Sequence, residues 1–308
     1  MRPMKNGPGI ASSRRAQARL GVAMSMPAVI LSVAFILVPL VAAVYLAFTN
    51  WNGLSANYGP FTGLANVREL LDDSVLWAAV RNNVAWIVVG TLSPLVISLV
   101  LAVLLWANTW GATLYRLVFL LPYVIPSVTI GIVWSWIYDP TNGWANRLLG
   151  DVGLGFLQRS WLSDPATVLY CILFAAIWGA TGFCTVMLSA ALQRVNQELI
   201  DSSRVDGANG VRQFWHVILP QIAPVFMTLM TYLLIGGFSV FDVVFVMTQG
   251  GPDNASNVLG TYAYTQAFVN SQIGYGTALA LLIAIFAVPF VVILNRVQRR
   301  MLLQGLGA

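Results

Sequence analysis

The sequence predicts an all-α fold, a polytopic membrane bundle of six helices. Its 308 residues are 58% hydrophobic and only 9% charged, which is too little polar surface for a soluble globule. Six segments are apolar over about 20 residues, the length that crosses a bilayer as a helix. Lys and Arg are also distributed unevenly among the connections between these segments, as in membrane proteins of fixed orientation.

The six predicted spans are Leu20–Phe48, Val84–Trp106, Leu117–Tyr138, Ala166–Leu192, Val225–Met247 and Thr277–Leu294. The first follows a basic N-terminus, as the apolar core of a signal peptide would. That core is about 7–15 residues long, and this apolar run is far longer. We therefore expect an uncleaved first span.

Basic residues orient the spans. Twelve of the sixteen Lys and Arg lie on one side: in the two terminal segments, around Arg116, and in the connection between the fourth and fifth spans. Loops on the cytoplasmic side of a membrane protein are rich in Lys and Arg, so both termini are predicted to be cytoplasmic. The predicted organisation is a cytoplasmic tail over 1–19, a transmembrane domain over 20–295 containing a cytoplasmic loop at 193–222, and a cytoplasmic tail over 296–308. The net charge of +5 thus reflects topology and not nucleic-acid binding.

The first outer connection is predicted to form a turn over 61–67 that leads into a short interfacial helix over 68–73. Asp72 and Asp73 could suggest a metal or diphosphate site. No second acidic cluster accompanies them, so solvated loop carboxylates are the favoured interpretation.

The third span contains Pro122 and Pro126, which free backbone carbonyls. Membrane interiors tolerate this where another helix or a watery cavity satisfies the carbonyls, so this span is a candidate wall of a pathway. Trp134, Trp136 and Tyr138 are expected in the aromatic belt at the interface.

The fourth span contains both cysteines, Cys171 and Cys184, thirteen residues apart. In one helix they are separated by about 20 Å, beyond the reach of a disulfide. They are expected to be buried apolar residues.

Asp242 is the one acid within the predicted spans and lies near the end of the fifth. A charge costs about 2.5–3.5 kcal/mol at the bilayer centre, and less near an end. The dipole at a helix C-terminus also opposes an acid. Asp242 is therefore expected to face protein or a water-filled cavity.

The connection from Glu198 to Pro220 is predicted to be helix, turn and helix. Asp206-Gly207 is a strong turn dipeptide, because Gly adopts positive φ without a Cβ clash. The second helix is expected to begin near Asn209 and to end at Pro220 and Pro224. Its apolar residues at i, i+3, i+4 and i+7 predict one packed face, made of Val211, Phe214, Trp215 and Ile218.

The chain lacks the residues for several kinds of chemistry. It has a single histidine, His216, so no histidine pair can bind a metal. Its one lysine, Lys5, lies in the N-terminal tail and not in a phosphate-binding loop. We assign no catalytic residue, no metal site and no cofactor to this chain. If ATP drives it, a second protein must bind the nucleotide.

Two motifs resemble those of a known family. Asp201-Ser202-Ser203, Asp206-Gly207-Ala208, Phe214 and Leu219-Pro220 match the spacing of the coupling motif in permease subunits of bacterial ATP-binding-cassette (ABC) importers, written Glu-Ala-Ala, Asp-Gly-Ala and Leu-Pro. The first part of the motif differs from the family pattern: Asp201 stands in place of Glu, and Ser202 and Ser203 stand in place of the two alanines. Phe241-Asp242, followed by Thr248-x-Gly-Gly-Pro, resembles a signature of the maltose-type subfamily, which imports sugars and glycerol phosphates.

The resemblance implies a type I importer permease in the bacterial cell membrane that works by alternating access. Its expected partners are a second homologous permease, two copies of an ABC ATPase that binds ATP and Mg²⁺, and an extracytoplasmic solute-binding protein. The coupling residues would be Asp201, Asp206, Gly207, Ala208, Phe214, Leu219 and Pro220. Aromatic and polar side chains suit a sugar pathway, and the candidates are Tyr123, Trp178, Tyr232 and Asp242.

Two other functions remain possible on sequence alone. An ion-coupled secondary transporter needs ionisable groups within the membrane, for which a single acid is meagre support. A membrane-embedded transferase needs clustered carboxylates in a cytoplasmic loop. The acids of the 193–222 loop alternate with Arg194, Arg204 and Arg212, which suits protein docking better than cation binding.

Overall fold

The computed structural model describes residues 10–305 apart from residue 56 and residues 108–110, and this part of the chain is helical. Lys5 and residues 1–9 of the predicted N-terminal tail lie outside it. In chain order the elements are α1 Ile10–Ser32, η1 Val33–Leu37, α2 Val38–Leu46, α3 Ala65–Asp72, α4 Ser74–Ala107, α5 Ala112–Val124, α6 Ser127–Ile137, α7 Trp144–Asp151, η2 Gly155–Leu157, α8 Val168–Leu192, α9 Gln197–Val205, α10 Gly210–Gln213, η3 Phe214–Ile218, α11 Leu219–Phe238, α12 Asp242–Thr248, α13 Leu259–Tyr264, η4 Thr265–Val269 and α14 Ile273–Gly305.

Five helices in the described chain are long and apolar enough to cross a membrane: Leu20–Leu46, Ser74–Trp106, Val168–Leu192, Gly210–Phe238 and Ile273–Gln298. The remaining predicted span, the third, corresponds to α5 and α6 together. The all-α membrane bundle is thus confirmed, and α3 confirms the short helix in the first outer connection.

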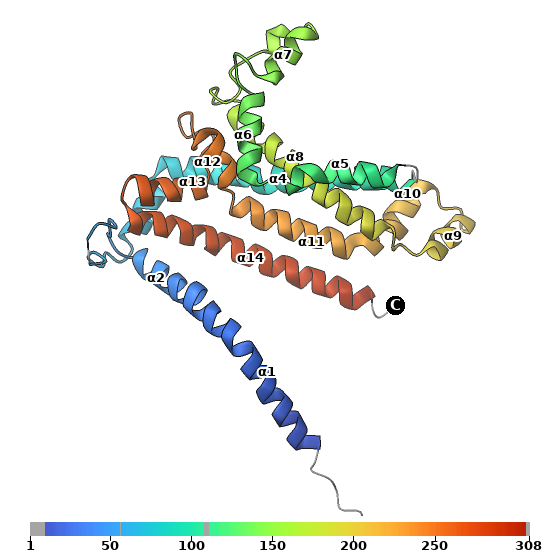
Figure 1. Cartoon of the computed structure of the whole chain (residues 1–308), viewed down its shortest axis with the longest axis horizontal. Coiled ribbons are helices and arrows are strands. Elements are labelled where there is room, and N and C mark those ends of the chain that lie inside the picture. The colour runs from blue at the N-terminus through green and yellow to red at the C-terminus, as the bar shows by residue number, and fades with distance from the viewer. Residues whose placement is uncertain (1–9, 56, 108–110, 306–308) are drawn as a thin grey trace, which may run out of the picture.

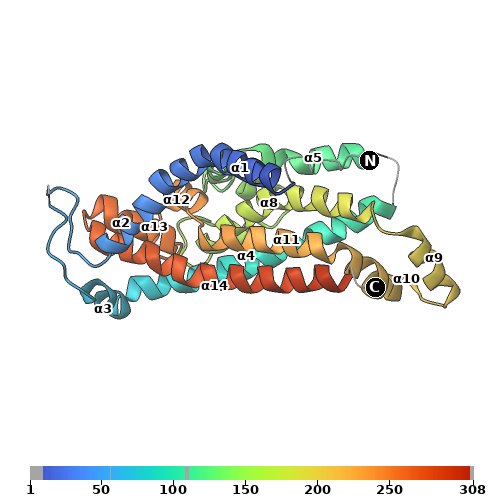
Figure 2. The same cartoon turned by 90° about the horizontal axis from the view of Figure 1, so that it is seen from below.

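The helices α4, α8, α11 and α14 pack along one another as the body of the bundle, whereas α1 diverges from it (Figure 1). Side chains of residues 20–42 are exposed, and the first span rejoins the bundle where α2 packs on α14. Along the long axis, α1 and α2 lead toward the end that carries α3, and α14 runs back toward α9 and α10 (Figure 2).

The third span is not one helix. The segments Leu114–Val124 and Ser127–Ile137 are bent by 96° relative to each other. Ile125 has an extended backbone with ψ 130°, as expected of the residue before a proline, which is sterically kept out of the helical region. The prediction of a continuous span over Leu117–Tyr138 is therefore wrong, and α6 leaves the bundle with α7 at its tip.

The fifth span also differs from its prediction over Val225–Met247. Its helix begins at Gly210 and ends at Phe238, and α12 starts separately at Asp242 after a break in which Phe241 has φ −149° and ψ −62°. Pro220 and Pro224 do not end the helix. The wide turn η3 precedes Pro220, and the Leu219 N–H donates to the Phe214 carbonyl five residues back. Such a turn lets a helix continue past a residue that lacks its own N–H.

Side-chain hydrogen bonds join the ends of several helices at the α3 end of the bundle. Asp73 accepts hydrogen bonds from the hydroxyl of Tyr262 and, at 2.6 Å, from that of Tyr275. Its other oxygen accepts from the Val75 N–H at 2.8 Å at the start of α4. Burial alone would raise the pKa of Asp73, but these hydrogen bonds outweigh it and hold the pKa below its ordinary value. Asp73 therefore ties α4 to α13 and α14.

Both cysteines are buried, as predicted, at 7% and 0% exposure for Cys171 and Cys184. Cys184 belongs to an apolar cluster that also contains Ile200 of α9, Ile218 of η3 and Ile222 of α11. This cluster fastens the segment after α8 to the body of the bundle.

Candidate functional site

The segment from α9 to α10 lies at one end of the bundle, opposite α3 (Figure 2). The Asn196 side chain caps α9 by accepting from the Glu198 N–H at 2.9 Å. The Asn196 N–H donates to Gln221 Oε1 at 2.9 Å, which ties the start of α9 to α11. The segment is therefore anchored at its first residue.

The turn after α9 depends on Gly207, whose φ is +79°. Its N–H donates to the Arg204 carbonyl at 3.0 Å, and the Ala208 N–H donates to that of Ser203 at 2.9 Å, which closes the end of α9. A Cβ built on Gly207 would meet nothing within 4 Å. The requirement for glycine is thus one of backbone conformation and not of space.

The second helix begins at Gly210, which confirms the predicted start near Asn209. The Asn209 side chain accepts from the Arg212 N–H at 3.0 Å, and Gln213 Nε2 donates to the Ala208 carbonyl at 3.2 Å. His216 is exposed, and its Nδ1 lies 3.1 Å from the Arg212 carbonyl.

The predicted packing face of this helix is only half right. Phe214 is half-buried and Ile218 is buried, but Val211 and Trp215 are 67% and 59% exposed. The turn η3 spans more residues than an ordinary helical turn, so the i, i+3, i+4 register does not persist through it. An apolar surface remains exposed here, which we call the α9–α10 patch: Leu199, Val205, Val211 and Trp215.

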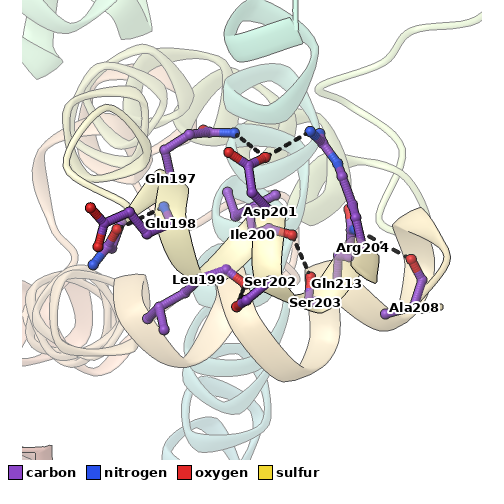
Figure 3. A network of polar contacts seen from close by, with 11 residues as sticks. Gln197, Glu198, Leu199, Ile200, Asp201, Ser202, Ser203, Arg204, Ala208 and Gln213 are labelled. Atoms are coloured by element: carbon purple, nitrogen blue, oxygen red, sulfur yellow. Dashed lines mark hydrogen bonds and ion pairs between the residues drawn. The ribbon is translucent and has the colours of Figure 1, made fainter. Parts of the chain in front are cut away.

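Asp201 lies on the exposed side of α9 and pairs within its own helix (Figure 3). Its Oδ1 accepts from Arg204 Nη1 at 3.0 Å and from Gln197 Nε2 at 3.3 Å. Both charged side chains are more than half exposed, so the pair contributes about 0–1 kcal/mol and is easily exchanged for another partner.

Ser202 and Ser203 are also paired within α9. Their hydroxyls donate to the carbonyls of Leu199 at 3.1 Å and Ile200 at 2.7 Å, within the same helix (Figure 3). Asp206 ends α9 and is exposed, Leu219 is half-buried and Pro220 is exposed. The seven predicted coupling residues thus lie on one continuous segment.

The four predicted pathway residues form three separate contacts. The hydroxyls of Tyr123 and Tyr232 are 3.5 Å apart, and Phe183 stacks on Tyr123 with ring centroids at 4.5 Å. Trp178 packs instead against Trp134 of α6, with centroids 5.8 Å apart. Sequence reasoning missed Phe183, since nothing distinguishes it from the other apolar residues of α8.

Asp242 contacts the start of the bent sixth helix. It accepts from the Ser127 hydroxyl at 2.7 Å and is the first residue of α12, while Ser127 is the first residue of α6. The expectation that a helix C-terminus opposes this acid is therefore wrong, because Asp242 lies where a helix dipole favours negative charge. Like Tyr123 and Tyr232, it is exposed.

The exposed side of α11 is unusually polar for an apolar span. Thr228 and Tyr232 of α11 and Ser239, which caps its end, are exposed on this side, with the exposed Gly236 between Tyr232 and Ser239 at the same spacing of three or four residues. Polar side chains within a membrane normally face a bundle interior or water. This spacing is the sequence signal that could have extended the pathway prediction beyond Tyr232.

A family model described as "binding-protein-dependent transport system inner membrane component" matches residues 94–303. A probable ABC transporter permease of Pyrococcus horikoshii is 30% identical over 86% of this chain and 91% of its own length. A diacetylchitobiose uptake permease of Streptomyces coelicolor is 30% identical over 87% and 78%. A trehalose/maltose permease of Thermococcus litoralis is 26% identical over 92% and 95%.

Among solved structures, a chain of a bacterial ABC transporter that imports the acidic polysaccharide alginate has the same fold. Its TM-score is 0.79 at 21% identity, and the match covers 95% of this chain and 99% of that one.

Proposed function

The chain belongs to the family of binding-protein-dependent transport system inner membrane components, and from this premise we propose that it carries a sugar or related polyol across the bacterial cell membrane. It is a multi-pass permease subunit of an ABC importer. The relatives named for diacetylchitobiose and for trehalose and maltose support a sugar as solute. The subfamily resemblance keeps glycerol phosphates as the alternative.

The single observation that carries the ATP-driven mechanism in this proposal is the exposed α9–α10 patch on an anchored segment. Leu199 and Val205 are exposed outside the candidate spans, and Val211 and Trp215 are exposed at the start of the Gly210–Phe238 helix, where a partner protein would cover them. In the proposal an ABC ATPase covers the patch, and Asp201 exchanges its pair with Arg204 for a cation of that ATPase. Gly207 and Ala208 shape the turn, and Asp206 adds charge at its edge.

Motion of the ATPase would reach α11 through two routes. The first is the hydrogen bond from Asn196 to Gln221. The second is the apolar cluster of Ile200, Ile218 and Ile222, to which Phe214 and Leu219 add contacts. Leu219-Pro220 then joins η3 to α11 without a break in the helix.

The ATPase, as two copies, would supply the ATP and Mg²⁺ sites. A solute-binding protein would deliver the sugar at the opposite end, beside α3 and α13. Twelve of sixteen basic residues on one side support a cytoplasmic location for both termini and for α9–α10.

A second homologous permease is the proposed neighbour of α1. A helix whose side chains are exposed over residues 20–42 gains no packing from its own bundle. In a complex of two such permeases, α1 would gain contacts with the partner on one face and keep lipid on the other.

The pathway would run along Tyr123, Trp178, Tyr232 and Asp242. Sugars offer apolar CH faces and hydroxyls, which aromatic rings and a few polar groups can bind. Purification in mild detergent tests the proposal: an ATPase and a second permease should accompany the chain, and a solute-loaded binding protein should stimulate ATP hydrolysis. Recovery of a lone chain with ion-dependent uptake would contradict it.

A further inference from the structure

Two neighbouring asparagines are buried in α4, near the end of the bundle that carries α3. Asn82 and Asn83 are only 1% and 3% exposed, in a helix apolar enough to cross the membrane. Polar side chains within a span are costly unless they are paired, and they commonly serve a function. The groups that each amide contacts therefore indicate what it does.

Asn83 joins the ends of two other helices. Its Nδ2 donates to the Gly237 carbonyl at 3.1 Å, and its Oδ1 accepts from the Leu259 N–H at 2.7 Å. Gly237 is the next-to-last residue of α11 and Leu259 is the first of α13, so both are backbone groups without a partner in their own helix. One side chain of α4 thus completes the end of α11 and the start of α13.

The backbones around Asn83 are also closely packed. A Cβ at Gly237 would lie 3.3 Å from the Ile87 Cα of α4. A Cβ at Gly260, the second residue of α13, would lie 2.7 Å from the Val240 carbonyl in the break that follows α11. The helices α4, α11 and α13 therefore meet at Asn83 with little freedom to separate.

The chain itself is a poor mechanical link between α11 and α13. The connection over 239–258 contains the break at Phe241 and the short helix α12, which packs on α6. A displacement of α11 could be absorbed in this connection. The 20 residues of α11 span about 30 Å, so Asn83 contacts this helix at the end far from α9 and α10.

Asn82 has a different set of partners. Its Nδ2 donates to the carbonyls of Ala255 and Asn257, at 3.0 Å and 2.8 Å. Both acceptors lie in the loop before α13, and neither belongs to α11. Asn82 therefore holds the loop on α4, whereas Asn83 holds the two helix ends.

We propose that Asn83 is a positioning residue for transport, which makes the far end of α11 move together with α4 and α13. A displacement of α11 that starts at the α9–α10 segment then reaches the α3 end of the permease and is not lost in the connection over 239–258. This inference rests on the proposed transport function and adds a residue that links its two ends.

The test measures solute imported per ATP hydrolysed in proteoliposomes that contain the whole importer and its binding protein, with maltose, trehalose and diacetylchitobiose as test solutes. Asn83→Leu keeps a side chain branched at the same position and removes both hydrogen bonds. The ratio should fall roughly fivefold, as expected from loss of one buried hydrogen-bonded link, while solute-stimulated hydrolysis continues.

Asn82→Leu is the matched control, because Asn82 is the adjacent residue, is equally buried and also makes two hydrogen bonds. Thermal unfolding in detergent should show similar losses of Tm in the two variants, and Asn82→Leu should keep the wild-type ratio. An equal fall of the ratio in both variants, or no fall in either, would overturn the role of Asn83.

A second variant covers the case in which leucine is not accepted at this buried position. Asn83→Ser has a smaller side chain whose hydroxyl is too short to bridge Gly237 and Leu259, so the ratio should fall here as well. A wild-type ratio in Asn83→Ser would refute the inference.

The wild-type importer separates this inference from the proposed function. If it imports none of the three solutes at the expense of ATP, the proposed function fails. If it imports one of them and Asn83→Leu has the same ratio, only the role of Asn83 fails.

Discussion

Replacing Gly207 by valine tests whether the shape of one turn governs communication with the ATPase. The φ of +79° is a conformation in which a residue with a Cβ is strained by about 1–2 kcal/mol. No atom lies within 4 Å of the would-be Cβ, so the cost is conformational and confined to the turn. It corresponds to a roughly 5- to 30-fold loss in the population of the native turn.

Gly210→Val is the control for this substitution. Gly210 lies three residues further along the same segment, also has open space around its Cβ, and has no positive φ. The assay is ATP hydrolysis by the purified importer with and without loaded binding protein, together with the amount of the chain in the membrane. We expect Gly207→Val to abolish stimulation at normal membrane levels and Gly210→Val to retain it. Full stimulation in Gly207→Val would refute the proposed role of the turn.

Three further outcomes are expected. Ile200→Ala should lower stability by about 2–4 kcal/mol, because Ile200 is 2% exposed in the cluster that holds α9; thermal unfolding in detergent measures this, and a loss below 1 kcal/mol would contradict the anchoring. Asp201→Asn should change stability by less than about 1 kcal/mol yet reduce stimulated hydrolysis, since the exposed pair contributes little to the fold. Hydrogen bonds keep the pKa of Asp73 in the folded state below its ordinary value of 3.8, so its stabilising contribution is present above that pH and is lost as the pH falls through the folded-state pKa. Tyr275→Phe should reduce this loss of stability at acid pH, as measured by unfolding at a series of pH values. An unchanged pH dependence would contradict a contribution from the Tyr275 hydrogen bond.

The sequence was sufficient for the features that depend on composition and on local turn chemistry. Apolar length predicted the spans, and Asp206-Gly207 with Asn209 predicted the turn and the start of the second helix, because glycine and a capping side chain act within a few residues. These determinants need no tertiary contact.

The wrong predictions of where helices bend, continue and end have a common physical cause. The bend before Pro126 and the wide turn before Pro220 are two responses to the same residue type, and which one occurs depends on the helices packed around each proline. The break between Phe238 and Asp242 has no proline at all. Asp242 begins a new helix that meets Ser127, a contact 115 residues away in the chain. Hydrophobic periodicity carries no information about such contacts.

The separation of α1 from the bundle has a consequence for biogenesis. The span Leu20–Leu46 leaves the ribosome before the five spans that follow it here, and over residues 20–42 its side chains are exposed and do not pack on them. Its apolar length alone is enough to hold it in lipid while the later spans are made and packed. In the proposed complex of two permeases, assembly would cover one face of this helix, so its exposure would distinguish an unassembled subunit from an assembled one.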